Sequence, residues 1–444
     1  MLSSSAILFY DSEYEPHYGQ PISQCSLLLR RAARQGSTAI NIVPTHYWMN
    51  ASGTVRAQPK CYADAWAESQ RVHHYCHLWE WDDDCRAFDA SAVQRFTEGF
   101  TRCLQEARSL FRTVLISPHL DDGSNTCHWR NLLFFDPLQK DAHGFSYYDI
   151  MIVPIIKAVQ VAYGGEAGKG KQLWFGMQGE MGATVFAYPR AYATIADRIR
   201  QHYTGKALLK VGLLLNHAYV TGVINRRGAA VRAAPTKMAH LDGGWGALLP
   251  FHKWPNHKHL SKNLHAIQSL VNDKVDILGI SNYAVAPGTS NSIQPVHLES
   301  AITKLDAELQ ALGIRLKAWR ASRPGKLFIM NEFGLGGGSS ECGDVVAHSP
   351  AQAGRTPWLG ITKTFSNRHN PWAVAGLRKY AEAYFAAALK LLAAGGVNYR
   401  VDAAFLWNMV SWDVQGIHPT ARSSEGSYEV PEIAAAIRAH NSKM

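Results

Sequence analysis

The chain has 444 residues, of which 47% are hydrophobic and 18% are charged, a balance typical of a globular protein with a large core. The formal net charge is +10, but the basic residues are spread along the chain, which argues against a nucleic-acid-binding protein. No run of 18 or more apolar residues occurs, so the sequence predicts no membrane-spanning helix. The charge would suit an anionic polysaccharide, although charge alone does not establish such a partner.

Apolar runs that predict strands alternate with amphipathic runs that predict helices from end to end. In chain order, the predicted strands are 6–10, 38–43, 113–117, 172–176, 208–215, 275–280, 327–330 and 403–407. The predicted helices are 22–35, 90–111, 147–161, 189–202, 260–271, 298–321, 372–394 and 431–440. Pro44 and Pro118 are expected to stop the second and third strands, because proline cannot donate a ladder hydrogen bond.

The strands are continuous apolar runs, which is typical of a parallel sheet buried on both faces. Eight such strands, each followed by a helix, predict an α/β fold: a closed (β/α)8 (TIM) barrel with no edge strand and long insertions after some strands. Two insertions run from about residue 45 to 89 and from about residue 220 to 255, and a loop after the strand at 327–330 extends to about residue 370. An open doubly wound sheet is the alternative. Since no repeat and no linker is visible, we expect a single domain over residues 1–444.

The N-terminal ten residues predict a first strand rather than a signal peptide, because they have no basic start and no cleavage site. A processed chain would look the same, so the compartment is left open. The seven cysteines leave at least one thiol unpaired. Cys61, Cys76 and Cys85 share one loop-like stretch and would form a bridge in an exported protein, whereas reduced thiols in a cytosolic protein are the alternative.

Two glutamates each follow a predicted strand. Glu180 ends the segment Gln-Leu-Trp-Phe-Gly-Met-Gln-Gly-Glu after the fourth strand, and Glu332 ends Leu-Phe-Ile-Met-Asn-Glu after the seventh. The carboxyl ends of barrel strands carry the active site, so these two side chains are expected to face each other across the mouth. Paired carboxylates can flank a glycosidic bond, one ionised and the other kept neutral by its partner's charge. A salt bridge or a helix cap is the alternative for either residue.

Three short segments resemble clan A glycoside hydrolases, the retaining (β/α)8 group of cellulases, β-mannanases and β-galactosidases. The segment Asn331-Glu-Phe-Gly is similar to the clan's nucleophile segment, Leu-Gly-Ile-Ser-Asn-Tyr283 to its sixth-strand segment, and Phe-Leu-Trp407-Asn to the end of its eighth strand. The resemblance implies that Glu332 is the nucleophile and Glu180 the acid/base. It also implies that Tyr283 hydrogen-bonds the nucleophile and that Trp407 forms a sugar platform.

The resemblance implies a retaining β-glycoside hydrolase that works by double displacement, needs no cofactor or metal, and takes a carbohydrate substrate. The large insertions and loop tryptophans favour endo action on a poly- or oligosaccharide. The clan places an asparagine directly before the acid/base, but this chain has Gly179 there. Either Gln178 takes over the contact with the sugar or this subsite holds a different ligand. The sugar, its linkage, the exact family and the oligomeric state are not predicted.

Further residues follow strands on the same predicted face and are expected to line the groove. Tryptophans suit this role because sugar rings stack on aromatic faces, although packing is the alternative for each. The groove residues expected in this way are His119, Asn216, His217, Trp48, Trp129, Trp245 and Asn331, the last directly before Glu332. Weaker candidates are His46, Tyr47, Tyr219, Trp254, Trp358 and Trp412.

Two other functions remain open. A metal-dependent barrel hydrolase could use His119 and His217 with nearby aspartates, and a catalytically inactive barrel could bind glycans only. Separately, the segment Arg71-Val-His-His-Tyr-Cys-His77 contains zinc-type ligands, but no standard spacing of two ligand pairs is present. A polar insertion loop is therefore the favoured interpretation of that segment, and no metal site is predicted.

Overall fold

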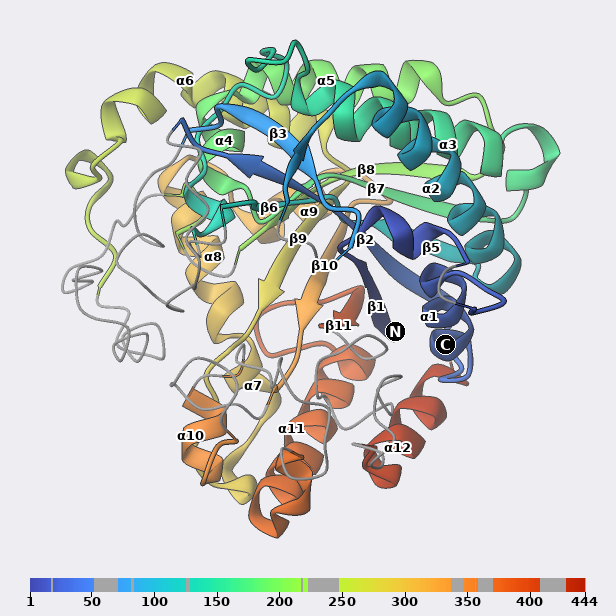
Figure 1. Cartoon of the computed structure of the whole chain (residues 1–444). Coiled ribbons are helices and arrows are strands. Elements are labelled where there is room, and N and C mark those ends of the chain that lie inside the picture. The colour runs from blue at the N-terminus through green and yellow to red at the C-terminus, as the bar shows by residue number, and fades with distance from the viewer. Residues whose placement is uncertain are drawn as a thin grey trace.

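The computed structural model describes residues 1–16, 19–51, 71–80, 84–124, 128–216, 219–222, 247–336, 346–355, 357, 370–407 and 429–443. Within these residues, eight parallel strands close into a barrel in the order β1-β11-β10-β9-β8-β7-β5-β2, and β2 pairs with β1 (Figure 1). The strands are β1 (Leu2–Leu8), β2 (Ala39–Met49), β5 (Thr113–Ile116), β7 (Gln172–Gly179), β8 (Leu208–Leu215), β9 (Ile277–Asn282), β10 (Leu327–Phe333) and β11 (Ala403–Leu406). The predicted (β/α)8 barrel is confirmed.

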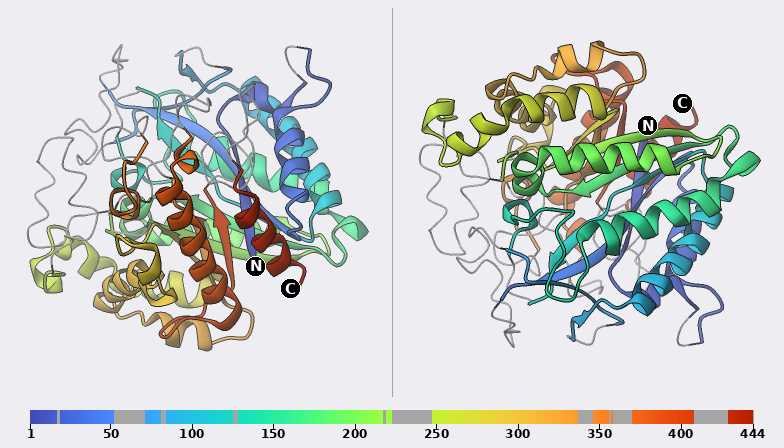
Figure 2. Two further views of the ribbon diagram at one scale, coloured as in Figure 1. Left: turned by 90° about the horizontal axis from the view of Figure 1, so that it is seen from below. Right: turned by 90° about the horizontal axis from the view of Figure 1, so that it is seen from above.

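Helices surround the barrel on its outside, as the views from below and above show (Figure 2). The longer ones are α1 (Gln24–Ala33), α2 (Ala90–Leu110), α3 (Val153–Tyr163), α5 (Pro189–His202), α6 (His257–Ser269), α8 (Ser300–Ala311), α11 (Ala375–Ala394) and α12 (Pro431–Asn441). The shorter ones are α4 (Gly182–Ala187), α7 (Pro295–Leu298), α9 (Leu316–Ala321) and α10 (Pro350–Arg355). Across the described ranges, no helix has the length and apolar character needed to cross a membrane.

The second strand is longer than predicted, and the expectation that Pro44 stops it is wrong. Strand β2 continues to Met49 because its later half pairs with β6 (His119–Asp122) on one side and with β3 (His74–His77) on the other. Pro44 removes one N–H donor, but the ladder is held on both sides of it. Pro118 interrupts rather than ends the third predicted strand, since β6 resumes directly after it. Strand β3 then pairs with the short β4 (Arg86–Ala87), so part of the first insertion is a small antiparallel extension of the sheet.

Two other predicted elements are wrong in their bounds. The predicted helix 298–321 is broken into α8 and α9, and Gly313 adopts a positive φ of 76° after α8, a conformation that ends a helix. The first strand begins at Leu2 rather than Ala6. Three serines precede the apolar run, so the apolar pattern starts later than the strand does. These serines are completely buried, and the apolar pattern could not reveal them.

The barrel interior has an apolar layer and a polar layer. The apolar layer is made by inward side chains from seven strands: Ala39, Leu115, Trp174, Leu214, Ile277, Ile329, Ala403 and Phe405. Such side-chain layers fill a barrel of this kind, so its lower part is a packed core and not a channel.

The polar layer joins four strands through buried hydrogen bonds. Asn41 donates to Ser5 and to the backbone oxygen of Asn331, both at 3.2 Å, and accepts from Ser117 at 2.7 Å. Asn331 donates in turn to Ser281 at 3.3 Å. Because buried polar groups are costly unless they are paired, this network fixes the strands relative to one another just below the carboxyl ends.

Two disulfides lie outside the barrel. Cys25 pairs with Cys103 and links α1 to α2, and Cys76 pairs with Cys85 beside β3 and β4. The bridge expected in the first insertion is therefore present between Cys76 and Cys85. The alternative of reduced thiols is wrong for the four cysteines of the two disulfides. Cys61, Cys127 and Cys342 lie outside the described residues.

One buried histidine of β2 lies on the outside of the barrel. His46 points away from the barrel axis and packs edge-on against Phe88 and Phe96, with ring centroids 4.8 and 4.4 Å away. It is therefore not the groove residue that the sequence suggested. Burial lowers the pKa of His46 to about 4, while Asp11 raises it and His77 lowers it.

We predict that replacing His46 with Met weakens the acid sensitivity of the protein. A histidine whose pKa is lowered by folding contributes its full stability above about pH 6.5, and this contribution is lost as the pH falls toward 4. The full loss is on the order of 3 kcal/mol in the free energy of unfolding. Urea unfolding at several pH values should show a shallower decline for H46M between pH 6.5 and 4. The exposed His202→Met is the control, and equal slopes for H46M and the wild type would contradict the prediction.

Candidate active site

Glu332 points into the barrel because β10 carries one extra residue. Met330 pairs with Ile280, but Glu332, two residues later, pairs with Ser281, the very next residue of β9. Ser281 lies on the inward side of β9, four residues after the interior Ile277, since side chains alternate along a strand. The bulge at Asn331 thus turns Glu332 inward, as bulges beside functional sites often do.

Glu180 is placed by a similar irregularity in β7. Gly176 pairs with Gly212, whereas Gly179 pairs with Leu214, so β7 also has one residue more than its partner. Glu180 follows with a φ of 58°, a left-handed conformation that is uncommon for a residue other than glycine. Its backbone N–H bonds to the Leu214 oxygen at 2.8 Å. Such strain persists only where the surroundings enforce it, and it is frequent at functional sites.

Glu332 is almost completely buried and contacts two side chains. Tyr283 donates its hydroxyl to Oε2 at 3.0 Å, which is the contact that the resemblance implied. His119 Nε2 lies 3.3 Å from Oε1. Burial raises the pKa of Glu332 to about 7, while Arg130 and the Tyr283 hydrogen bond oppose this rise. Burial thus favours the protonated form of Glu332, whereas Arg130 and Tyr283 favour the carboxylate.

Both oxygens of Glu180 are also engaged. Asn216 donates to Oε1 at 2.8 Å, and Arg130 donates from Nη1 to Oε2 at 3.0 Å. Burial and the charge of Glu332 raise the pKa of Glu180, whereas Arg130, His119 and Ser281 lower it. Ser281 also lowers the pKa of Glu332, so its hydroxyl lies close to both acids. The two carboxyls are thus electrostatically coupled at the carboxyl ends of β7 and β10.

Sequence reasoning missed Arg130 and Asp121. Arg130 begins a 3₁₀ turn (Arg130–Leu132) after β6 and donates from Nε and Nη2 to Asp121 Oδ1, at 3.0 and 2.9 Å. Although burial alone lowers the pKa of Arg130, Asp121 and Glu180 raise it above its ordinary value. Asp121 stands two residues after His119 on β6, and the period of two along a strand could have revealed it. Nothing in the sequence marks Arg130.

His119 explains why position 179 holds glycine. A Cβ on Gly179 would lie 2.4 Å from His119 Cδ2 and 2.7 Å from Nε2, far inside contact distance. The His119 ring is stacked on Trp407, with centroids 5.4 Å apart and planes 21° apart. Burial, followed by Arg130, lowers the pKa of His119 to about 3, so the ring is neutral near pH 7. The asparagine expected by resemblance is excluded because His119 occupies its space.

The other predicted residues fall into two groups. Gln178 and Trp48 are completely buried, and Asn331 is 1% exposed and hydrogen-bonded to Ser281 in the polar layer of the barrel. None of the three offers a surface to a sugar. Gln178 instead accepts from the Met181 N–H at 2.8 Å. Trp129 is half-buried beside Arg130, with Tyr219 6.5 Å from its ring. Among the weaker candidates, Trp254 is buried as well. The predicted residues His217, Trp245, Trp358 and Trp412 lie outside the described residues.

The histidine-rich segment at 71–77 does not gather its ligands. Cys76 is in a disulfide, and His77 Nδ1 faces Asp11 Oδ2 at 2.7 Å. His73 and His74 contact each other at the surface, with Nδ1 atoms 3.1 Å apart. In the part of the chain that the structure describes, no three His, Cys, Asp or Glu side chains are arranged to hold a metal ion.

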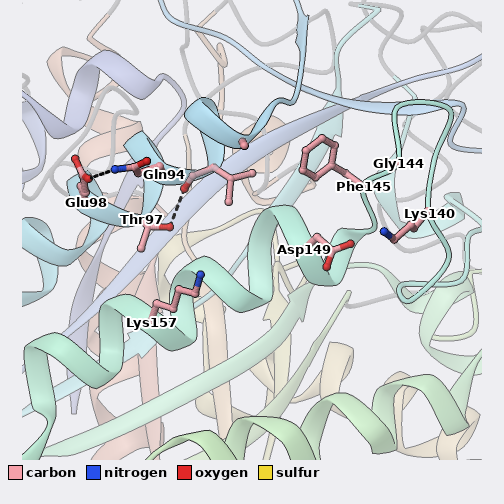
Figure 3. A pocket seen from close by; sticks show the side chains of 10 residues that line it. Gln94, Thr97, Glu98, Lys140, Gly144, Phe145, Asp149 and Lys157 are labelled. Carbon is pink, nitrogen blue, oxygen red and sulfur yellow. Dashed lines mark hydrogen bonds between the residues drawn. The ribbon is translucent and has the colours of Figure 1, made fainter.

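A hollow of about 630 Å³ lies on the outer wall, between α2 and the segment that leads into α3 (Figure 3). Lys140, Asp149 and Lys157 surround it, and Gln94 donates to Glu98 at its edge. Neither paired glutamate lines this hollow. The candidate active site is therefore the pair Glu180 and Glu332 at the mouth of the barrel, and not this hollow.

No family model and no curated protein matches the sequence. Solved structures align over nearly the whole chain at low identity. A glycoside hydrolase family 5 mannosidase from Rhizomucor miehei is 10% identical, with a TM-score of 0.41, over 100% of this chain and 93% of that one. An endo-1,4-β-D-mannanase from Thermotoga petrophila is 11% identical, with a TM-score of 0.36, over 100% and 99%. An endo-β-1,4-glucanase from Xanthomonas axonopodis is 11% identical, with a TM-score of 0.41, over 100% and 99%. Likenesses this weak carry no argument about activity.

We predict that Gly179→Ala destabilises the protein and that His119→Ala relieves the effect. The added Cβ overlaps the His119 ring, and such overpacking costs about 1–3 kcal/mol. In the H119A background the same substitution should cost much less. The double-mutant cycle, measured as free energies of unfolding, tests this coupling. Gly376→Ala is the matched control, because its Cβ meets no atom within 4 Å. Additive costs for G179A and H119A would contradict the assigned contact.

Proposed function

We propose that this chain is a glycoside hydrolase that retains the configuration of the sugar it cleaves. The observation that carries the proposal is the pair of buried carboxyls, Glu180 and Glu332, turned inward at the mouth of the barrel and coupled through their charges and Ser281. Paired carboxyls of this kind are the chemical requirement of glycoside hydrolysis. The half-buried Trp407, stacked on His119, supplies an aromatic face beside them.

In the proposed mechanism, Glu332 attacks the anomeric carbon while Glu180 gives its proton to the departing oxygen. Glu180 then takes a proton from water, which releases the sugar from Glu332. Tyr283 supports this assignment because its hydrogen bond stabilises the Glu332 anion. Burial and the Glu332 charge support protonation of Glu180, although the bound Arg130 opposes it.

One observation favours a second function, a barrel that binds glycans without cleaving them. Arg130 and Asn216 occupy both oxygens of Glu180, so the acid has no unengaged oxygen in this conformation. A general acid must present its proton to the leaving oxygen, and one of these contacts must therefore yield when substrate binds. Inactivity toward activated glycosides, combined with measurable glycan binding, would establish this second function.

We predict that Glu332→Gln and Glu180→Gln each reduce hydrolysis of aryl glycosides at least about 100-fold. Tyr283→Phe should lower kcat/KM about 10- to 100-fold, because it removes a hydrogen bond to a charged group. Tyr399→Phe is the matched control: it removes the Tyr399 bond to Asp306 at 3.0 Å, away from the two glutamates. Initial rates on a set of aryl glycosides provide the measurement. Full activity in either glutamine variant would refute the proposed mechanism.

Azide distinguishes the two roles within the same experiment. With an activated substrate, E180A should form a glycosyl azide of the same anomeric configuration as the substrate, since azide replaces water in the second step. E332A should give the opposite configuration, because azide then attacks the sugar directly. The reverse pattern, read by NMR of the products, would exchange the roles of Glu180 and Glu332.

We also propose that the substrate is a poly- or oligosaccharide cut internally. The large insertions and the loop tryptophans of the sequence support this proposal, and we expect a soluble β-glucan or β-mannan to lose viscosity early and to yield products of mixed length. A polysaccharide panel analysed by product size, with E332A as the blank, provides the measurement. Release of single sugars from one chain end, without loss of viscosity, would contradict internal cleavage.

A further inference from the structure

Arg130 is held in a fixed position between two acids. Its Nε and Nη2 bind Asp121 Oδ1, while Nη1 binds Glu180 Oε2. The Arg130 side chain is only 16% exposed, so water screens these contacts weakly. A guanidinium presents its donors in a rigid plane, and fixing one edge on Asp121 therefore fixes the direction of Nη1.

The contact with Arg130 favours one state of Glu180. A carboxylate accepts a charge-assisted hydrogen bond from Nη1, and this bond weakens when the carboxyl becomes neutral. The other ionisable group that acts strongly on Glu180 is Glu332 on β10, whose charge has the opposite effect. His119 on β6 is neutral near pH 7. Asn216 after β8 and Ser281 on β9 add hydrogen bonds without charge.

We propose that Arg130 is a positioning residue that holds the Glu180 carboxyl in place and favours its ionised form, and that Asp121 fixes Arg130 for this purpose. The kinetic consequences rest on the proposed function. The proton affinity of Glu180 does not, so it can be measured whether or not the protein cleaves glycosides.

The two chemical steps show what Arg130 would contribute. In the first step, a Glu332 oxygen bonds to the anomeric carbon, the glycosidic bond breaks, and the Glu180 proton moves to the leaving oxygen. Glu332 is then a neutral ester, so its charge no longer favours protonation of Glu180. Arg130 remains, and it keeps Glu180 ionised and ready to take a proton from water in the second step. That step forms the bond from water to carbon and returns Glu332 as a carboxylate.

The first test is a pH profile of kcat/KM for Arg130→Met. An adjacent arginine typically lowers a carboxyl pKa by about one to three units, so its removal should move the basic limb, which belongs to Glu180, to higher pH by about one unit or more. Because Arg130 also lowers the pKa of Glu332, the acidic limb should move to higher pH as well. Arg130→Lys keeps the charge but loses the fork, and it should shift the basic limb less. Arg200→Met is the matched control, because Arg200 binds Asp276 at 2.6 Å just before β9 begins, at the opposite end of the barrel. An unshifted basic limb in R130M would overturn the proposal.

The second test does not depend on activity. In protein with ¹³C-labelled glutamate carboxyls, the signal of Glu180 is the one missing from E180Q. It should titrate at higher pH in R130M than in the wild type, and R200M should leave it unchanged. If R130M does not fold, Arg130→Gln removes the charge and keeps an amide donor. Equal titration midpoints in a folded Arg130 variant and the wild type would overturn the proposal. A wild type without glycosidase activity but with the expected shift would refute only the proposed function.

Discussion

One extra residue in β7 and one in β10 orient the site. In a regular strand, side chains alternate, and Glu332 would share the register of Asn282 rather than that of the inward Ser281. The bulge at Asn331 reverses this orientation, and the left-handed backbone of Glu180 follows a similar shift. The extra residue of β10, Asn331, is itself hydrogen-bonded to Asn41 in the polar layer, which keeps the neighbouring strands in register.

The electrostatics follow from this placement. Two carboxyls brought inward at the same end of a barrel lose most of their water, and burial raises the pKa of both. The surrounding side chains then make the two acids different. Tyr283 binds Glu332 with a neutral hydroxyl, whereas Arg130 binds Glu180 with a full charge. His119 remains neutral between them and, through its bulk, requires glycine at position 179. The departure from the expected asparagine is thus a packing consequence of one neighbouring ring.

The sequence predicts the barrel well because eight apolar runs in regular alternation with helices leave few other folds. It also indicates Glu180, Glu332 and Asn216, since each follows a predicted strand and the carboxyl ends of the strands meet at one mouth, while Tyr283 is indicated by the resemblance to clan A. It does not reveal the bulges in β7 and β10, beside which Gln178 and Asn331 are buried, nor that β2 continues to Met49 and buries Trp48. Arg130 was missed because it lies in a short turn whose position depends on tertiary contacts with Asp121 and Glu180. The serines of β1 are not predicted because they are polar although they are buried, and of their hydroxyls Ser3 bonds to the Ala39 oxygen and Ser5 accepts from Asn41.

The seam of the barrel joins the two ends of the chain. Strand β1 pairs with β11, and Asn441 at the end of α12 exchanges two hydrogen bonds with the backbone of Leu2 (Figure 1). During synthesis on the ribosome, β1 emerges before the other barrel strands, and its β11-facing edge remains open until β11 leaves the exit tunnel. An open strand edge is a template for pairing with other chains. A nascent barrel therefore carries an unpaired β1 edge until β11 has been made, and a chaperone that shields β1 would protect that edge.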